Sequence, residues 1–315
     1  MEKKGDLTSE QLIGLIILVI SFVVILILYA SLNWNPTIDK EVCHQSVIYR
    51  ATLHEITKNP QIVPLKCQTE KICLTNGNEC VYGKPSKKNP VTTVKLNSDK
   101  EKAKKEVSDS ISNSLLDCHT MLGEGKIQFQ PNDWGSKNYC LVCSRFSLDE
   151  KAKLEVNQIT YPELYNYMLA KKTPDEKSYL YSLYGVSNQN ELNTVLNKAL
   201  EISGKKSISD LTIDLTKENS VIVQVETSGA IWKWVAGGGA AGGAGATAIF
   251  LGISLAPFTL GGSLALAAVG VAGVGGGIVY ANAYPDSHVY LAPAIYPYDE
   301  KSLSQLGCTN FETAP

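Results

Sequence analysis

Two long apolar stretches flank a polar stretch of roughly 200 residues, which is long enough to bury a core of its own. The first stretch, residues 12–32, contains no charged side chain. A helix of this length spans a hydrocarbon core of about 30 Å, and Tyr29 and Trp34 lie where aromatic side chains meet the membrane interface. We therefore predict a transmembrane helix over residues 12–32, with residues 1–11 in the cytoplasm.

The second apolar stretch, residues 231–284, is rich in Gly and Ala and has no charged residue between Val235 and Tyr284. A turn at residues 257–262 divides it into two parts, each close to the length of a membrane span. Aromatic residues at both outer ends fit a transmembrane helical hairpin that enters and leaves the membrane on one side. This prediction leaves the tail, residues 285–315, on the same side as the polar stretch.

Glycines spaced four residues apart in the second apolar stretch would let helices approach each other closely. The predicted helix-packing positions are Gly238, Gly239, Gly242, Gly243, Gly273 and Gly277. The alternative is a Gly- and Ala-rich hairpin buried in the core of a soluble body.

The polar stretch, residues 33–230, predicts an α+β domain. Apolar and polar residues alternate over residues 46–53 and 139–146, as they do in half-buried strands. Two further alternating runs, residues 211–215 and 221–225, are separated by a short polar segment and predict a β-hairpin.

Helices are predicted at three places in the same domain. Apolar residues recur every four positions over residues 98–118. A capping box with a proline at residues 173–176 predicts a helix that ends at Gly185. Residues 187–203 have one apolar face and are followed by Gly204.

The chain contains eight cysteines, and an even number in an exported chain indicates a disulfide framework in an oxidising compartment. They are Cys43, Cys67, Cys73, Cys80, Cys118, Cys140, Cys143 and Cys308. The many pairings open to eight cysteines leave their connectivity undetermined. Free thiols or a zinc site are the alternatives.

Three groups of residues could carry chemistry. Cys140 and Cys143 have the spacing of a redox motif, but their neighbours predict a strand and not the helix N-terminus that lowers a thiol pKa. Cys118 and His119 could join them in a zinc site, although the spacing is irregular. Residues 123–126 lack the length and the ending of a phosphate-binding loop, so they predict a turn. We expect structural disulfide cysteines and no metal.

Catalytic and nucleic-acid-binding functions have little support. The four histidines occur in no triad or zinc-helix motif, so we predict a non-enzymatic protein without a cofactor. The 29 Lys and Arg residues nearly balance the 31 Asp and Glu residues. A near-neutral chain offers no basic face for nucleic acid.

Lys3 to Glu10 resemble the class III signal peptide of type IV pilins and their archaeal relatives. In that family a membrane peptidase cuts after the glycine that follows basic residues, and a glutamate occupies the fifth mature position. The resemblance implies cleavage after Gly5, a new N-terminus at Asp6, and pairing of Glu10 with the free amine of a neighbouring subunit. An uncleaved signal anchor is the alternative, and either signal places the body outside the cytoplasm.

We therefore expect a cell-membrane protein with an extracellular main domain, archaeal by its signal, with a structural or adhesive function. Expected partners are membrane lipid, further copies of the chain or other surface proteins, and a prepilin peptidase. A filament-forming pilin-like subunit is a second possibility, although a membrane hairpin would resist extraction of the N-terminal helix during assembly. A third is an oligomeric pore or membrane-remodelling protein acting through the glycine-rich hairpin, and a fourth is an anchored enzyme using Cys140 and Cys143.

Overall fold

The computed structural model describes most of the chain. The described residues are 15, 17–24, 37–57, 65–77, 80–83, 91–127, 129, 139–203, 205–227, 249–251, 268–272, 277–283, 288–306, 308 and 310–312. The chain divides into two compact units, Met1–Asp39 and Lys40–Pro315.

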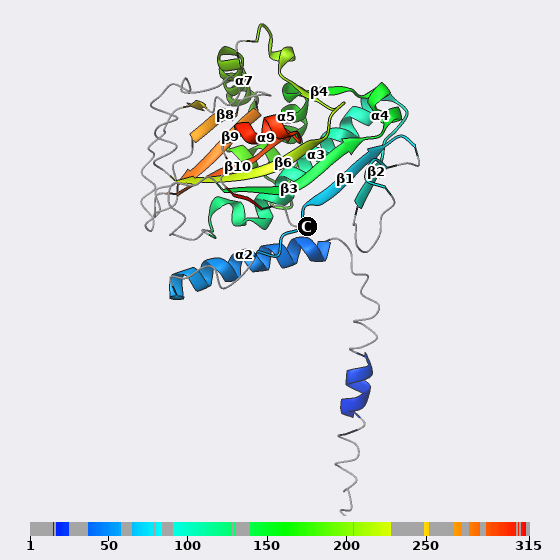
Figure 1. Cartoon of the computed structure of the whole chain (residues 1–315), viewed down its shortest axis with the longest axis vertical. Helices are drawn as coiled ribbons and strands as arrows, with labels where there is room; N and C mark the ends of the chain where they lie inside the picture. Colours follow the sequence, from blue (N-terminus) through cyan, green and yellow to red (C-terminus); the bar gives the residue numbers. More distant parts are fainter. Residues whose placement is uncertain are drawn as a thin grey trace, which may run out of the picture. The chain divides into compact units, whose positions relative to one another are not determined.

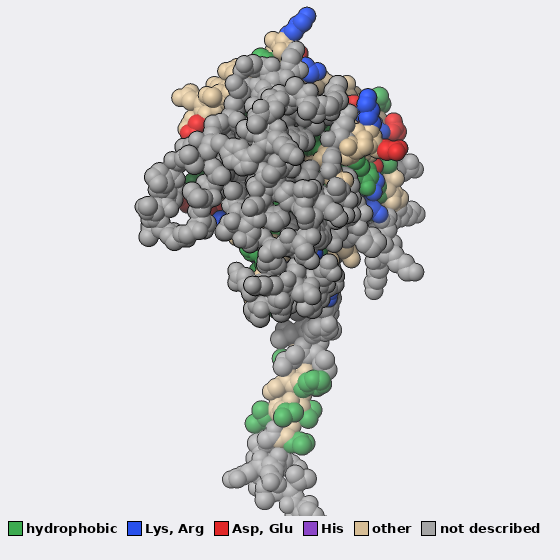
Figure 2. All heavy atoms as spheres, turned by 60° about the vertical axis from the view of Figure 1, so that its left-hand side comes forward, with side chains coloured by type: hydrophobic (Ala, Val, Ile, Leu, Met, Phe, Trp, Pro, Cys, Tyr) green, Lys and Arg blue, Asp and Glu red, His purple; other side chains and the backbone are tan. Residues whose placement is uncertain are grey.

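The first unit contains a short helical segment from the first apolar stretch. Leu15 and residues 17–24 are helical, and their large apolar side chains are between 46% and 69% exposed. These side chains are green in Figure 2. The rest of residues 12–32 lies outside the described part, and among the residues that are described no helix combines the length and the apolar character needed to cross a membrane.

The body contains helices and strands in mixed order (Figure 1). The helices are α2 (Thr37–Thr57), α3 (Lys100–Met121), α4 (Glu150–Glu155), α5 (Tyr161–Ala170), α6 (Tyr179–Tyr184), α7 (Gln189–Ser203) and α9 (Glu300–Gln305), with 3-10 turns η2 (Gly123–Gly125) and η4 (Ile208–Asp210). The strands are β1 (Glu70–Thr75), β2 (Val91–Lys95), β3 (Tyr139–Leu148), β4 (Gln158–Thr160), β5 (Thr212–Asp214), β6 (Asn219–Thr227), β7 (Ile249–Leu251), β8 (Ala268–Ala272), β9 (Gly277–Ala283), β10 (His288–Pro297) and β11 (Asn310–Glu312).

The main sheet is mixed. Its order is β2-β1-β3-β6-β10-β9-β8-β7, and β11 pairs with the first residues of β3. Strands β2, β1 and β3 run parallel, whereas each neighbour from β3 to β7 is antiparallel. Strands β4 and β5 form a separate antiparallel pair. The predicted α+β domain is confirmed.

Hydrophobic clusters lie on both faces of the central strands β3, β6 and β10. In β6, Val221 and Val223 belong to the larger cluster, with side chains of α3, α5, α6 and α7, whereas Ile222 belongs to the smaller one. Alternate residues of a strand point to opposite faces. Leu306, which follows α9, joins the smaller cluster. The helices α3 to α7 therefore pack on one face and the α9 segment packs on the other.

The sequence of α3 explains its position. The Asp99 side chain accepts a hydrogen bond from Lys102 N and caps the first turn. The inward residues recur every three or four positions and are completely buried. They are Ala103, Val107, Ile111, Leu115 and Cys118. The prediction of a helix over residues 98–118 is confirmed, as are the strand at 139–146 and the helix within 187–203.

Two predictions of local structure are wrong in the body. Residues 46–53 lie within α2 and not in a strand; Cys43, Ser46, Val47 and Arg50 are buried, and this spacing is helical. The predicted β-hairpin is also absent among the described residues, because β5 pairs with β4 while β6 pairs with β3 and β10.

The helix predicted from residue 173 starts later than expected. Residues 173–177 form a turn, and α6 begins after Ser178, whose hydroxyl accepts a hydrogen bond from Tyr181 N. Gly185 ends the helix with φ of 69°, as predicted, because glycine adopts left-handed backbone without strain.

The transmembrane helical hairpin predicted at residues 231–284 is wrong for its described residues. Residues 249–251, 268–272 and 277–283 are β7, β8 and β9, and they extend the main sheet beyond β10. Glycine is a poor helix former, whereas the alternating valines of β8 suit a strand. The alternative of a Gly- and Ala-rich hairpin within the body agrees with these strands.

Candidate functional site

Four disulfides fix the body, which confirms the predicted framework. They are Cys43–Cys67, Cys73–Cys80, Cys118–Cys143 and Cys140–Cys308. All eight cysteines of the sequence are therefore paired. Three of the bonds attach α2 to the residues just before β1, α3 to β3, and the C-terminal segment to β3. The fourth joins β1 to the residues that follow it.

The C-x-x-C motif does not form a redox pair. Cys140 belongs to the smaller hydrophobic cluster and Cys143 to the larger one, so they face opposite sides of β3. Each is bonded to a different partner, and Cys118 is not free to join His119 in a zinc site. Among the described side chains, no group of three His, Cys, Asp or Glu residues could hold a metal ion.

His119 and the turn after it have structural surroundings. The imidazole is buried, its Nδ1 lies 3.2 Å from the Tyr290 hydroxyl, and burial lowers the pKa of His119 to about 4. Gly123 adopts φ of 74°, and an added Cβ would lie 2.5 Å from Ile127 Cδ1. Residues 123–126 are therefore a tight turn that requires glycine, as the sequence predicts.

A groove of about 530 Å³ lies at the edge of the sheet, on the face that carries α3. The outward side of α3 forms one wall, with Lys105, Asp109, Asn113 and Asp117 at successive turns. Strands β1 and β2 contribute Glu70, Ile72, Thr92 and Val94. Lys40 of α2 and Tyr167 of α5 also line the groove.

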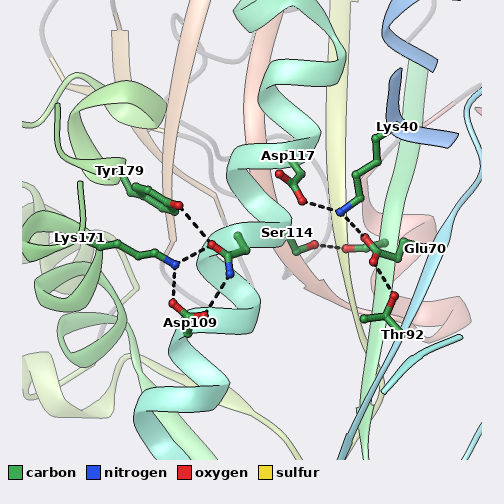
Figure 3. Close-up of polar contacts among 10 residues, drawn as sticks. Lys40, Glu70, Thr92, Asp109, Ser114, Asp117, Lys171 and Tyr179 are labelled. Atoms are coloured by element: carbon green, nitrogen blue, oxygen red, sulfur yellow. Dashed lines mark hydrogen bonds and ion pairs between the residues drawn. The ribbon is translucent and has the colours of Figure 1, made fainter. Parts of the chain in front are cut away.

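A network of hydrogen bonds around Lys40 forms one end of the groove (Figure 3). Lys40 Nζ lies 2.5 Å from Asp117 Oδ2 and 3.1 Å from Glu70 Oε2. The Thr92 hydroxyl donates to Glu70 Oε1 over 2.8 Å. Burial opposes the charge of Lys40, but the carboxylates of Glu70 and Asp117 outweigh it and raise the pKa of Lys40 above its usual value.

A second network surrounds Asp109 (Figure 3). The Asp109 carboxylate accepts hydrogen bonds from Lys171 Nζ and from the Tyr167 hydroxyl. Lys171 also donates to Asn113 Oδ1 over 2.6 Å, and its Nζ lies 4.7 Å from the centre of the Tyr179 ring. Burial works against ionisation of Asp109, but these hydrogen bonds lower the pKa of its carboxyl below the usual value.

The pKa shifts of Asp109 and Lys40 do not suit these two groups to acid–base or nucleophilic catalysis. An acid–base catalyst needs a pKa near the working pH, and a nucleophilic lysine needs a lowered pKa. Asp109 and Lys40 are shifted in the opposite directions. The lining contains four carboxylates and two lysines, so it suits a neutral or cationic polar ligand.

Several predicted site residues lie outside the described part. These are the signal-processing residues Gly5, Asp6 and Glu10, and the helix-packing residues Gly238, Gly239, Gly242, Gly243 and Gly273. Gly277 is the first residue of β9 and not part of a helix.

The groove was not predicted from the sequence, although one signal for it is present. The signal is a set of polar residues that recur every four positions and therefore share one helix face: Lys105, Asp109, Asn113 and Asp117.

The sequence matches no protein-family profile, no curated protein and no solved structure.

Proposed function

We propose that this protein is a membrane-anchored, non-enzymatic cell-surface protein with a structural or adhesive function. The observation that carries the proposal is the pairing of all eight cysteines in four disulfides. Disulfides persist in oxidising compartments and are rare in the cytosol of most cells. A disulfide-bonded body of this kind belongs outside the cytoplasm.

Residues 12–32 are the proposed anchor. The described part of this segment exposes Leu18, Phe22 and its other large apolar side chains. Burying one such side chain contributes about 1.5–3 kcal/mol, so a bilayer is a far better environment for them than water. The body and the C-terminal tail then lie outside, because the described residues of 231–284 form strands of the body and do not need to enter the membrane.

The strands also favour a filament-forming pilin-like subunit as the second candidate. A membrane hairpin at residues 231–284 would argue against a filament, because it would hold the protein in the bilayer. With β7, β8 and β9 in the sheet of the body, the described residues of 231–284 offer no membrane hairpin that would oppose extraction of the proposed N-terminal helix. The pilin-like signal at Gly5, Asp6 and Glu10 supports this candidate.

In this proposal, the groove beside α3 is the ligand-binding site of the adhesive function. Its paired charges are suited to holding a polar ligand and not to activating one. We expect the ligand to be uncharged or cationic.

Membrane topology tests the proposal. The full chain, with an epitope tag after Pro315, is expressed in a host with a prepilin peptidase, and intact cells are treated with protease. We expect the protein to resist carbonate extraction and the tag and body to be digested from outside. Extraction by carbonate, or a body protected until the cells are lysed, would contradict the proposal.

N-terminal sequencing of the same preparation separates the two signals. Asp6 as the first residue supports pilin-like processing, whereas an intact Met1 or Glu2 supports an uncleaved anchor. Ordered filaments in electron micrographs that are lost on Glu10→Ala would favour the filament subunit.

A further inference from the structure

Helix α2 has one buried face and one exposed face, on which apolar side chains lie among the polar side chains of Glu41, Gln45 and Thr52. Cys43, Val47 and Arg50 are buried against the body. On the opposite side Val42 is 38%, Ile48 39% and Tyr49 62% exposed. At 3.6 residues per turn these three side chains lie on one side of the helix.

The polar residues of the exposed face bond within the helix. Gln45 Nε2 donates to Glu41 Oε1 over 3.2 Å, and the Thr52 hydroxyl donates to the Ile48 carbonyl over 2.9 Å. Buried polar groups are costly when they have no partner. These internal hydrogen bonds reduce the cost of moving the Gln45 amide and the Thr52 hydroxyl out of water, whereas the Glu41 carboxylate has to stay among the lipid headgroups and water.

The body prevents α2 from turning this face inward. Cys43 is bonded to Cys67, and the Ser46 hydroxyl accepts a hydrogen bond from Lys66 N over 3.0 Å. Lys40, on the inward side, is held by Glu70 and Asp117. Among the described residues, nothing in the body covers Val42, Ile48 and Tyr49, and α2 cannot rotate to bury them.

The chain itself indicates what covers them. Thr37, the first residue of α2, follows Leu32 by five positions, and five residues span at most about 18 Å. The interfacial layer on each side of the hydrocarbon core is about 5–8 Å thick. Trp34 lies in the connection, and Trp and Tyr favour this layer. The outer lipid surface is therefore within reach of α2 and can cover its apolar face without a second protein.

We propose that α2 is an interfacial helix, lying on the outer surface of the membrane with Val42, Ile48 and Tyr49 at the boundary between lipid headgroups and acyl chains. Amphipathic helices bind at this depth through their apolar face. The inference rests on the proposed membrane anchor. Because Lys40 of α2 also lines the groove, this contact holds the groove close to the membrane surface.

Photo-crosslinking of the full chain tests the position of α2. Benzoylphenylalanine replaces Ile48 in one sample and Leu154 in the control, and both are reconstituted in vesicles of phosphatidylcholine with a minority of phosphatidylglycerol. Leu154 is 88% exposed on α4, so it matches Ile48 as a tolerant surface position. We expect about tenfold more lipid adduct at position 48 than at position 154, since α2 contacts the bilayer and α4 does not.

Three results would overturn the inference. Adducts at position 48 that join two copies of the chain identify the face as a protein interface. Equal lipid adducts at positions 48 and 154, or none at 48, show that α2 does not lie on lipid. Carbonate extraction of the same vesicles keeps the two proposals apart, because released protein contradicts the anchor, whereas retained protein without the adduct contradicts only the placement of α2.

Discussion

Helices α2 and α3 have similar lengths, 21 and 22 residues, and a disulfide holds each of them to the body. Both bury one face in the same hydrophobic cluster. Their outward faces differ: α3 carries Asp109 and Asp117 in ion pairs, whereas α2 exposes Ile48 and Tyr49. The outward face of α3 is suited to water or a polar ligand, and the mixed outward face of α2 is suited to the boundary between lipid headgroups and acyl chains.

Removing the disulfides should have the largest effect on this pair of helices. The Cys43–Cys67 and Cys118–Cys143 bonds span 24 and 25 residues. In the chain-entropy account each therefore stabilises the fold by about 3.5 kcal/mol. We expect losses of that size for the two double alanine variants, measured by urea unfolding of the full chain in detergent.

Hydrogen exchange distinguishes the two variants. Without Cys43–Cys67, exchange should speed up in α2 and not in α3, because α3 keeps its own disulfide and buried face. A neutral effect of either double variant on unfolding would contradict the framework role of that bond.

Shortening one apolar side chain on each helix should give the next largest difference in the free energy of unfolding. Leu115 of α3 is completely buried, and Leu115→Ala should destabilise the body by about 2–5 kcal/mol. Ile48→Ala on α2 should change stability in detergent by less than about 0.5 kcal/mol. Urea midpoints of both variants check this, and a large loss for Ile48→Ala would show that its side chain packs against protein.

The sequence predicts a helix correctly where the local pattern of apolar residues determines it, and fails where contacts with the rest of the body determine it. The inward stripe of α3 repeats every four residues, so Val107 and Ile111 define the helix locally. In α2 the β-branched and aromatic residues 47–49 mimic a strand, and only packing through Val47 and the Cys43 disulfide shows the helical period. Tertiary contacts overrode the local signal there.

The same distinction applies to the groove. The polar stripe of α3 is visible in the sequence, but Glu70 and Thr92 meet it only because β1 and β2 pair in parallel at the sheet edge. Parallel pairing joins segments that lack a local turn signal. The β-hairpin prediction failed for the related reason that β5 finds its partner in β4, far back in the chain.

The inward face of α3 should also make stability depend on pH. The pKa of His119 falls from an ordinary value of 6.5 to about 4, since burial opposes its charge; the Glu124 carboxylate and the Lys126 ammonium act in opposite directions. Between these two values the unfolded chain binds more protons than the folded one, so stability falls as the pH falls. We expect a loss of roughly 2–3 kcal/mol between pH 7 and pH 4 from this residue.

A variant pair isolates the contribution of His119. His119→Gln should flatten the unfolding free energy between pH 7 and pH 4, while Asp117→Asn, on the outward side of the same turn, should leave the dependence in place. An unchanged pH profile in His119→Gln would show that other groups cause it.

The smallest expected contrast between two variants is at the Lys40 end of the groove, where α2 and α3 are joined by an ion pair. Lys40 Nζ contacts both Asp117 and Glu70, but the Lys40 and Asp117 side chains are 29% and 41% exposed, so water screens the pair. Such pairs contribute about 0.2–1 kcal/mol, and Lys40→Met should lower the free energy of unfolding by an amount in that range at low salt.

Lys105→Met, on the same groove, is the matched control and should change the free energy of unfolding by less than about 0.5 kcal/mol. In a double-mutant cycle with Asp117→Asn, only Lys40 should show coupling, and about 1 M salt should reduce it because the Debye length falls to about 3 Å. Equal effects of the two lysine variants would show that the groove end is held by packing of α2 and not by its ion pairs.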